Sequence, residues 1–255
     1  MQLLDSAVDH ADKGGLTLRA MGAAAIRRSS PGAASIHRSF RKLSDVDFVT
    51  YSKQLSKIER SLAEIGFKGR PRGLTVEIFA NRRILFYESQ GEALWTDLFA
   101  DTLDMNHVID YRGRLELEYP TTPLAELFLQ KAQIVKINEK DLKDLCILFL
   151  DHDVEDNDPD HRAIDARYVA NLLSKDWGFY YTVTTNIEKL HRLMDRWSDI
   201  FNQDQLKVIR DRSTKLLNEI DKKEKTLGWK VRAKVGPKKV WYKEVEELDR
   251  RPEEI

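Results

Sequence analysis

The stretch RKLSDVDFVTYSK, residues 41–53, places two aspartates, Asp45 and Asp47, at the head of an apolar run that is typical of a β-strand entering a core. Successive side chains of a strand alternate between its two faces, so both aspartates project from one face, with their Cα atoms about 7 Å apart. Val46 and Phe48 take the opposite face. Two adjacent carboxylates repel each other unless water, a proton or a cation lies between them. The pair therefore predicts a site for a divalent metal ion.

The residues before this strand predict a turn that can hold a phosphate group. LTLRAMG, residues 16–22, alternates as a strand does, and AAAIRRSS, residues 23–30, has the pattern of a helix start, so Gly22 marks the turn between them. Backbone N–H groups are free at the first turn of a helix, where the dipole is positive, and both features favour phosphate. We therefore expect Gly22 and Ala23 to contact a bound phosphate group.

The residues after it predict one helix and several strands. YSKQLSKIERSLAEIGF, residues 51–67, carries apolar side chains at helical spacing. Strand-like runs follow at residues 74–80, 82–89, 93–100 and 114–119. The first two of these runs are separated by a tight turn at Asn81, which predicts a hairpin.

A third aspartate, Asp97, lies alone inside the apolar strand ALWTDLFA, residues 93–100. A carboxylate in such a run needs a partner if it is buried. It could instead face water on an edge strand, or pair with Arg82 or Arg83. Asp101 is the rival for the third carboxylate, but the sequence around it is already turning polar, as in a loop. We favour Asp97.

Brought to one edge of a sheet, the three aspartates could hold two divalent ions that bridge the phosphates of a nucleotide and an attacking hydroxyl. Asp45 and Asp47 would hold the ion that carries the triphosphate. Asp97 would complete the second site and help to ionise the acceptor hydroxyl. Mg²⁺ and Mn²⁺ both suit oxygen ligands of this kind.

The second half of the chain predicts mostly helices. Thr122–Pro123 is a good start for one helix, and Asn138 could cap another that runs through Leu150. DHDVEDNDPDH, residues 151–161, is acidic and polar and indicates a surface loop or a domain boundary. Residues 162–225 carry helical patterns rich in charge.

The stretch TLGWKVRAKVGPKKVWYKEV, residues 226–245, predicts a β-hairpin with arms on either side of Gly236–Pro237. It interleaves Trp229, Trp241 and Tyr242 with six basic residues, which is the composition of a nucleic-acid contact. The alternative, which we favour slightly, is an aromatic face that packs on the helices while the lysines meet water.

The length and composition of the chain limit the number of domains and the kinds of partner that it can have. The chain has 255 residues, 42 basic and 42 acidic, and is 42% hydrophobic, which is enough to bury a core in one or two domains. Balanced charge argues against a histone-like polyanion binder but leaves a local basic face open. We expect an α+β protein: a first domain at residues 1–150 with a mixed β-sheet flanked by helices, an acidic linker or loop at 151–161, and a helical C-terminal domain at 162–255 that ends in the basic hairpin.

The one cysteine, Cys146, lies in an apolar helical pattern and is expected to be a buried thiol, so neither an intrachain disulfide nor a cysteine-based zinc site can form. No signal-peptide pattern and no apolar run of membrane-spanning length is present. We therefore expect a cytoplasmic protein with no membrane partner.

The ordered set LRAMGAAAI, RKLSDVDFVT, ALWTDLFAD and LAELFLQKAQIVKINEKDLKDL resembles the nucleotidyltransferase superfamily typified by DNA polymerase β. It is more closely similar to the bacterial and archaeal abortive-infection type nucleotidyltransferases, several of which are toxins of toxin–antitoxin pairs. The resemblance covers about residues 15–150. The positions that match the family pattern are Arg41, Asp45, Asp47, Asp97, Lys131, Lys140, Asp141 and Asp144.

The resemblance implies a metal-dependent enzyme that moves a nucleoside monophosphate from a nucleoside triphosphate onto an acceptor hydroxyl. It implies that Arg41, Lys131 and Lys140 contact the nucleotide. The acceptor could be a tRNA end, another RNA or a protein side chain, and an antitoxin protein is an implied partner.

The chain departs from the family at the glycine turn. Family members usually have two small residues there, often followed by a hydroxyl-bearing residue, whereas here Gly22 is followed by three alanines. The alternative is therefore a catalytically inactive nucleotidyltransferase-type module that binds a nucleotide or a partner protein.

Some of these residues also have structural interpretations. Lys131 lies in a helix whose other side is apolar, so it could extend to the surface rather than contact phosphate. Lys140, Asp141 and Asp144 could cap and solvate a helix start, which we favour for Asp144. His107 has no second histidine at ligand spacing, so we expect it in a loop or in the core.

Overall fold

The computed structural model describes residues 2–69, 82–89, 92–156 and 162–245, and it has a mixed α+β architecture. Its main sheet has the strand order β1-β2-β5-β4-β3. The strands are β1 (Leu18–Met21), β2 (Asp47–Thr50), β3 (Phe67–Gly69), β4 (Arg82–Ser89) and β5 (Glu92–Ala100). Neighbours pair antiparallel except β2 and β5, which are parallel, so the sheet is mixed.

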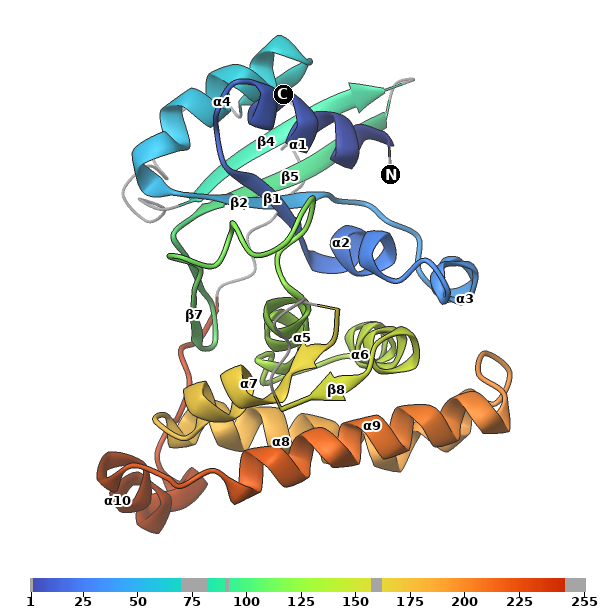
Figure 1. Ribbon diagram of the computed structural model, residues 1–255, viewed down its shortest axis with the longest axis vertical. Coiled ribbons are helices and arrows are strands. Elements are labelled where there is room, and N and C mark those ends of the chain that lie inside the picture. Colours follow the sequence, from blue (N-terminus) through green and yellow to red (C-terminus); the bar gives the residue numbers. More distant parts are fainter. Residues whose placement is uncertain (1, 70–81, 90–91, 157–161, 246–255) are drawn as a thin grey trace.

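Two helices pack against the sheet and against each other, α1 (Gln2–Lys13) and α4 (Leu55–Glu64) (Figure 1). A short 3₁₀ turn, η1 (Ser52–Gln54), precedes α4. The side chains of Ile58 and Leu62 are fully buried, as expected from their helical spacing. On β2 and β5, Phe48 and Leu98 are fully buried, so the face that carries them belongs to the core.

Four helices lie between the sheet and the far end of the molecule (Figure 1). They are α2 (Gly22–Ser29), α3 (Ala34–Phe40), α5 (Leu124–Ala132) and α6 (Glu139–Asp151). Every residue of α5 is buried, which makes it the central helix of the fold. Helix α2 contacts both α5 and α6, so the turn that starts α2 is held against the centre of the molecule.

The remaining helices form the layer farthest from the sheet, namely α7 (Ala166–Leu173), α8 (Trp177–Leu193), η2 (Met194–Trp197), α9 (Gln203–Lys222), α10 (Leu227–Val235) and η3 (Gly236–Lys238). Two small ribbons complete the structure, β6 (Thr102–Asp104) with β7 (Val108–Asp110), and β8 (Val154–Glu155) with β9 (Ile164–Asp165). One continuous cluster of buried apolar side chains extends from α1 to α9.

Several predicted elements are confirmed. The mixed sheet flanked by helices is present, and the helices expected at residues 51–67 and after Pro123 are α4 and α5. Asn138 caps α6, because its Oδ1 accepts a hydrogen bond of 3.0 Å from the backbone N–H of Asp141. Cys146 is fully buried, as expected.

The β-hairpin expected at residues 226–245 is wrong: this segment forms α10 and η3. The Thr226 hydroxyl caps α10 by accepting a hydrogen bond of 3.3 Å from the backbone N–H of Trp229. Gly236, at φ 62°, ends the helix. Alternating apolar and basic residues over so short a run fit a helix as well as a strand, and the cap decides between them.

The strand expected at residues 114–119 is also wrong, because this segment is a series of turns. Gly113 lies at φ 71°, and the backbone N–H of Arg114 donates to the carbonyl of Tyr111 at 2.9 Å, which closes a local turn in place of a strand ladder.

Of the expected loop at 151–161, Asp151 ends α6 and Val154–Glu155 forms β8, while residues 157–161 lie outside the described residues. The strand expected at 74–80 and the turn at Asn81 also lie outside them. No described helix is both long enough and apolar enough to cross a membrane.

Candidate functional site

Asp47 and Asp97 are neighbours on one face of the sheet. Strands β2 and β5 are parallel, with Phe48 opposite Leu98, so the residue before each of them projects from the other face. The Asp47 carboxylate accepts a hydrogen bond of 3.2 Å from the backbone N–H of Asp97. Asp97 is buried, with 6% of its surface exposed. The structure thus brings together two of the three aspartates that the sequence singles out.

Asp45 lies two residues before Asp47 and therefore on the same face. It forms an isolated parallel bridge with Trp95, the residue two before Asp97 on β5. The backbone N–H of Val46 donates to the Trp95 carbonyl at 3.1 Å, which extends the pairing of the two strands as far as Asp45. Asp45 and Asp47 are both half-buried. The three aspartates thus share one face of two adjacent strands.

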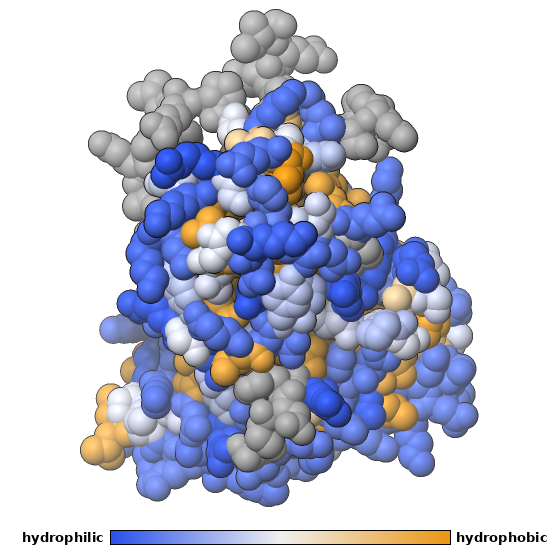
Figure 2. Space-filling view, turned by 45° about the horizontal axis from the view of Figure 1, so that its top comes forward, coloured by the Kyte–Doolittle hydropathy of each residue, from blue (hydrophilic) through white to orange (hydrophobic). Residues whose placement is uncertain are grey.

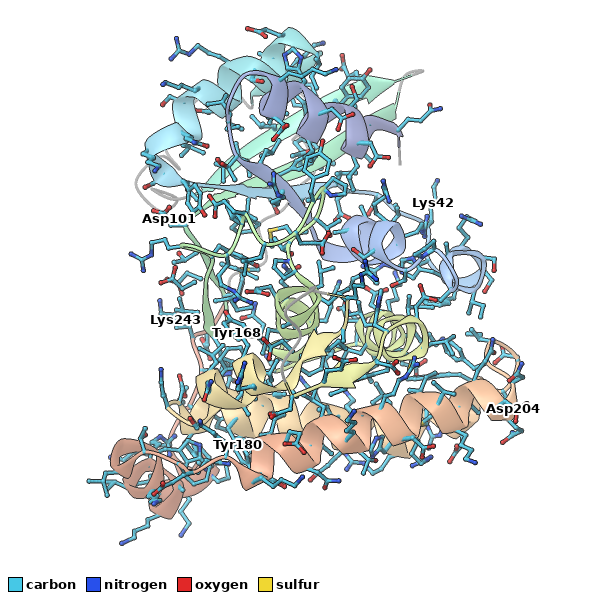
Figure 3. The ribbon with its side chains drawn as sticks, viewed as in Figure 1. Lys42, Asp101, Tyr168, Tyr180, Asp204 and Lys243 are labelled. Carbon is cyan, nitrogen blue, oxygen red and sulfur yellow. The ribbon has the colours of Figure 1, made fainter. Side chains whose placement is uncertain are left out.

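Asp101, the rival to Asp97, lies elsewhere. Its carboxylate accepts a hydrogen bond of 2.9 Å from the backbone N–H of Ser52. Figure 3 shows it at the end of the sheet opposite to Lys42, which follows Arg41 and precedes the aspartate strand. Asp101 therefore fixes the start of η1 and does not join the aspartate face.

Gly22 lies directly against Asp47. It has φ 71°, and a Cβ atom at this position would be 3.1 Å from Oδ2 of Asp47. The left-handed backbone and the close carboxylate both favour glycine. The turn between β1 and α2, which the sequence predicts at Gly22, is therefore held in contact with the aspartate face.

The first N–H of this turn is already engaged. The backbone N–H of Gly22 donates to the side-chain oxygen of Gln130 on α5 at 2.9 Å. Gln130 in turn donates to the hydroxyls of Tyr111 at 2.9 Å and Thr122 at 3.1 Å. Sequence reasoning missed Gln130, although a glutamine inside the apolar helix LAELFLQKA is a signal that could have drawn attention to it.

Ala23, Ala24 and Ala25 are all buried in the core cluster or beside it. Their small side chains allow α2 to pack closely on α5 and α6. Ala23 can therefore offer a ligand its backbone but not its side chain.

A buried cluster of charged side chains joins α5 and α6 to the segment that enters β2. Lys131 Nζ lies 2.7 Å from Asp141 Oδ1 and 3.0 Å from Asp144 Oδ2. Arg41 Nη1 lies 3.5 Å from a carboxylate oxygen of each of the same two residues. The sequence marked all four residues, and the structure brings them together.

The burial of this cluster corrects the expectation for Asp144 and excludes one of the two alternatives for Lys131. Asp144 is fully buried rather than solvated at a helix start, and Lys131 is buried rather than extended to the surface. Burial alone would lower the pKa of Lys131, but Asp144 and Asp141 outweigh it and raise that pKa. Burial alone would raise the pKa of Asp144, but Lys131, a hydrogen bond from His37 and Arg41 together lower it. Both groups therefore stay charged at neutral pH.

Two further members of the cluster were not foreseen. The Arg27 Nε–H donates to Nδ1 of His37 at 2.9 Å, and Nε2 of His37 lies 2.9 Å from Asp144 Oδ1. Because Nδ1 accepts a hydrogen bond, His37 carries its proton on Nε2 and is neutral. Arg27 also donates to the Arg41 carbonyl at 2.5 Å. The cluster thus ties α2 and α3 to the segment that leads into Asp45.

Lys140 does not join this cluster. It is exposed at the start of α6, and it forms no ion pair with any side chain that the structure describes. Its proposed contact with a nucleotide stays a prediction.

The donor chemistry of the aspartate face suits a hard cation, because carboxylate oxygens are the ligands that Mg²⁺ and Mn²⁺ prefer. Within the described ranges, no group of three His, Cys, Asp or Glu side chains is arranged to hold one ion. The metal site expected from Asp45, Asp47 and Asp97 therefore stays a prediction.

Two predictions outside this site can also be compared with the structure. His107 is in the core, as expected, where its ring stacks on Phe179 at 4.7 Å between centroids and burial lowers its pKa to about 4. Trp229 contacts Tyr180, and Trp241 contacts Tyr181 and donates to Thr182 Oγ1 at 3.0 Å. These tryptophans pack on α8, as in the favoured alternative.

Comparison with known proteins gave no match to a family model, to a curated protein or to a solved structure.

Proposed function

We propose that this protein is a metal-dependent nucleotidyltransferase, with the nucleotidyltransferase type of fold that its motifs resemble. The observation that carries the proposal is the adjacency of Asp47 and Asp97 on parallel strands, with the Gly22 turn in contact with Asp47. Paired carboxylates beside a glycine turn are the parts that phosphoryl transfer requires.

In the proposed reaction, an acceptor hydroxyl oxygen forms a bond to the α-phosphorus of a nucleoside triphosphate, and the bond from that phosphorus to the β-phosphate oxygen breaks. Pyrophosphate leaves, and Asp97 takes the hydroxyl proton. A divalent ion, Mg²⁺ or Mn²⁺, would neutralise phosphate charge when bound by Asp45, Asp47 and Asp97.

The buried cluster supports an anionic substrate. Arg27, Arg41 and Lys131 carry three positive charges, Asp141 and Asp144 carry two negative charges, and His37 is neutral, which leaves a net charge of +1. The three cations lie on α2, on the segment that enters β2 and on α5, which contacts the Gly22 turn through Gln130. A triphosphate at the turn would be attracted to it.

The acceptor and the partners are proposed from the resemblance alone. We propose an RNA, such as a tRNA end, or a protein hydroxyl as acceptor. We also propose that the protein acts as the toxin of a toxin–antitoxin pair.

The test is label transfer from each α-³²P-labelled nucleoside triphosphate, with Mg²⁺ or Mn²⁺ and total cellular RNA and protein. Wild type is compared with Asp47→Asn, which keeps an oxygen to accept the Asp97 N–H, and with Asp101→Asn as the matched control. We expect label on RNA or protein with wild type and with Asp101→Asn, and none with Asp47→Asn. Equal labelling by wild type and Asp47→Asn would contradict the assignment.

A second candidate is an inactive module that binds a nucleotide or a partner. It is favoured by the burial of Ala23–Ala25, which leaves no side-chain hydroxyl at the turn, and by the engagement of the Gly22 N–H with Gln130. This candidate predicts equilibrium binding of nucleoside triphosphates with no transfer of label to any acceptor.

A further inference from the structure

Positive charge is concentrated near the end of the chain. Residues 225–243 contain seven basic residues and no acidic residue, although the whole chain has equal numbers of each. This stretch comprises the residue pair before α10, α10 itself, η3 and the segment that follows. The local potential there is positive in a molecule that is neutral overall.

Helix α10 is attached to α8 by one side only. The Trp229 ring lies 5.1 Å from the ring of Tyr180, and the guanidinium of Arg232 lies 4.6 Å from the ring of Trp177. Thr226 is tied to the chain before α8 by a hydrogen bond of 3.0 Å from its N–H to the carbonyl of Ser174. The aromatic side chains are thus used to anchor α10.

The opposite side of α10 exposes apolar side chains. Leu227 and Val231 are one helical turn apart and are 81% and 65% exposed, and Val240 beyond the helix is 72% exposed. Among the large apolar side chains that the structure describes, these three are the most exposed. Figure 2 shows hydrophobic residues at the end of the molecule where α10 lies.

Lysines lie beside these apolar side chains. Lys230 and Lys234 fall within the same third of the helix circumference as Leu227 and Val231, and all four are exposed. Lys230 Nζ is 3.8 Å from the exposed carboxylate of Glu224. Lys234, Lys238 and Lys239 form no ion pair with the part of the chain that the structure describes.

We propose that this surface, the α10 face (Leu227, Lys230, Val231 and Lys234), is a docking site for an acidic amphipathic helix of a partner protein. Such a helix buries the exposed leucine and valine under its own apolar stripe and places carboxylates against the lysines. Two apolar side chains one turn apart match the i, i+4 spacing of a facing helix.

The chemistry of the face favours a protein helix over the other anions. RNA would contact the lysines but has no apolar group for Leu227 and Val231, and the tryptophans that could stack on bases are packed on α8. A membrane-bound helix usually presents a broad apolar face with aromatic residues, which the α10 face lacks.

The docking site is separate from the aspartate face. Figure 1 shows α10 and the sheet at opposite ends of the long axis of the molecule, so a helix bound to α10 leaves the aspartates uncovered. The inference therefore does not depend on the proposed enzymatic activity.

The probe is a fluorescein-labelled 20-residue peptide in which leucines recur at i, i+3, i+4 and i+7 and glutamates fill the flanking positions. A second peptide has the same composition in scrambled order, so that its charge is unchanged. Both are titrated with the full-length protein and followed by fluorescence anisotropy. We expect micromolar binding of the patterned peptide and at least tenfold weaker binding of the scrambled peptide.

Two variants test the two components of the face. Leu227→Ser with Val231→Ser removes the apolar part, and Lys230→Gln with Lys234→Gln removes the charge. Each should weaken binding at least tenfold, which is about 1.4 kcal/mol. The matched controls are Val108→Ser and the double change Lys57→Gln with Lys215→Gln, all at exposed positions on other elements, and these should leave binding unchanged.

Three results would overturn the proposal. The first is equal affinity for the patterned and scrambled peptides, which would indicate charge attraction alone. The second is binding of the patterned peptide that the Leu227 and Val231 changes do not weaken. The third is tighter binding, lost with the lysine changes, of a labelled 20-nucleotide RNA or of phosphatidylserine-containing vesicles.

Discussion

Gly22 is the residue through which the helix turn and the aspartate face meet. Replacing it with alanine forces an L-residue into the left-handed region and places a Cβ atom 3.1 Å from the Asp47 carboxylate. Gly113 has the same φ, but a Cβ atom there would have no heavy atom within 4 Å. We expect Gly113→Ala to lower the free energy of unfolding by about 1 kcal/mol and Gly22→Ala by about 2 kcal/mol or more. Urea denaturation measures both, and equal losses would contradict the close contact.

Asp144 is the carboxylate that balances the buried cluster. Asp144→Asn leaves Lys131 and Arg41 with one anion, and removing one partner of a buried pair costs about 3 to 5 kcal/mol. The control is Glu139→Gln on the same helix, whose exposed side chain lies 3.9 Å from Lys143 and should cost less than about 1 kcal/mol. Urea denaturation at pH 7 separates the two, and similar losses would show that the cluster is not a buried ion pair.

The same residue makes a prediction for pH. The pKa of Asp144 is lowered in the folded state, so its contribution to stability is complete above its unfolded pKa of about 3.9 and is lost as pH falls through the lower folded value. Wild type should therefore lose more stability below about pH 4 than Asp144→Asn does. If the free energy of unfolding of the two proteins fell in parallel with pH, the lowered pKa of Asp144 would be contradicted.

His107 gives a pH dependence in a higher range. Burial lowers its folded pKa to about 4, while the unfolded value is about 6.5, so the unfolded state binds the proton first. Its contribution to stability is thus complete above about pH 6.5 and is lost as pH falls toward 4. His107→Gln should remove this part of the slope in denaturation measured between pH 7 and 4.5. An unchanged slope would exclude His107 as its source.

The residues of the site differ in how far the sequence reveals them. Strand alternation was enough to predict that Asp45 and Asp47 share a face, and one glycine marked the turn at Gly22, because both signals are local. Gln130 and His37 escaped notice, because a polar residue inside a helix is marked as functional only by its burial. Asp144 was taken for a solvated helix-start residue for the same reason.

At the scale of single elements, helix caps decide where a helix begins when the pattern of apolar residues fits more than one structure. Asn138 caps α6 through its side-chain oxygen and is itself exposed, so its replacement changes no packing. Asn138→Ala should lower the free energy of unfolding by about 1 kcal/mol, and Asn138→Gly by only a few tenths. Thermal or urea denaturation of the two variants checks this, and a larger loss for glycine would point to a role other than capping.

Helix α10 shows how an element can be mistaken. Its residues alternate well enough to suggest a strand, but Thr226 caps a helix and Gly236 ends it. The turns at residues 114–119 show the opposite case, in which an alternating run is bent by Gly113 and by local hydrogen bonds. Elements long enough to carry several helical turns, such as α4 and α6, were predicted correctly because their period is sampled more than once.

At the scale of the whole molecule, the parallel pairing of β2 with β5 creates the candidate site. These strands are about fifty residues apart in sequence, yet their pairing places Asp47 beside Asp97. Nothing local in the sequence fixes which strands become neighbours, so the mixed sheet was predictable as a class while its order, β1-β2-β5-β4-β3, was not. The layer of α7, α8 and α9 carries α10 at its far end (Figure 1).

The central claim is that the aspartate face transfers nucleotides, and the most direct measurement is the initial rate of pyrophosphate release from the four nucleoside triphosphates. The full-length protein is supplied with Mg²⁺ or Mn²⁺ and total cellular RNA and protein, because pyrophosphate is the common product for every base and acceptor. We predict release by wild type and by Asp101→Asn at similar rates, and release at least a hundredfold slower by Asp47→Asn, with all three proteins equally stable. Release by Asp47→Asn at the wild-type rate, or no release by wild type with any triphosphate, would contradict the account.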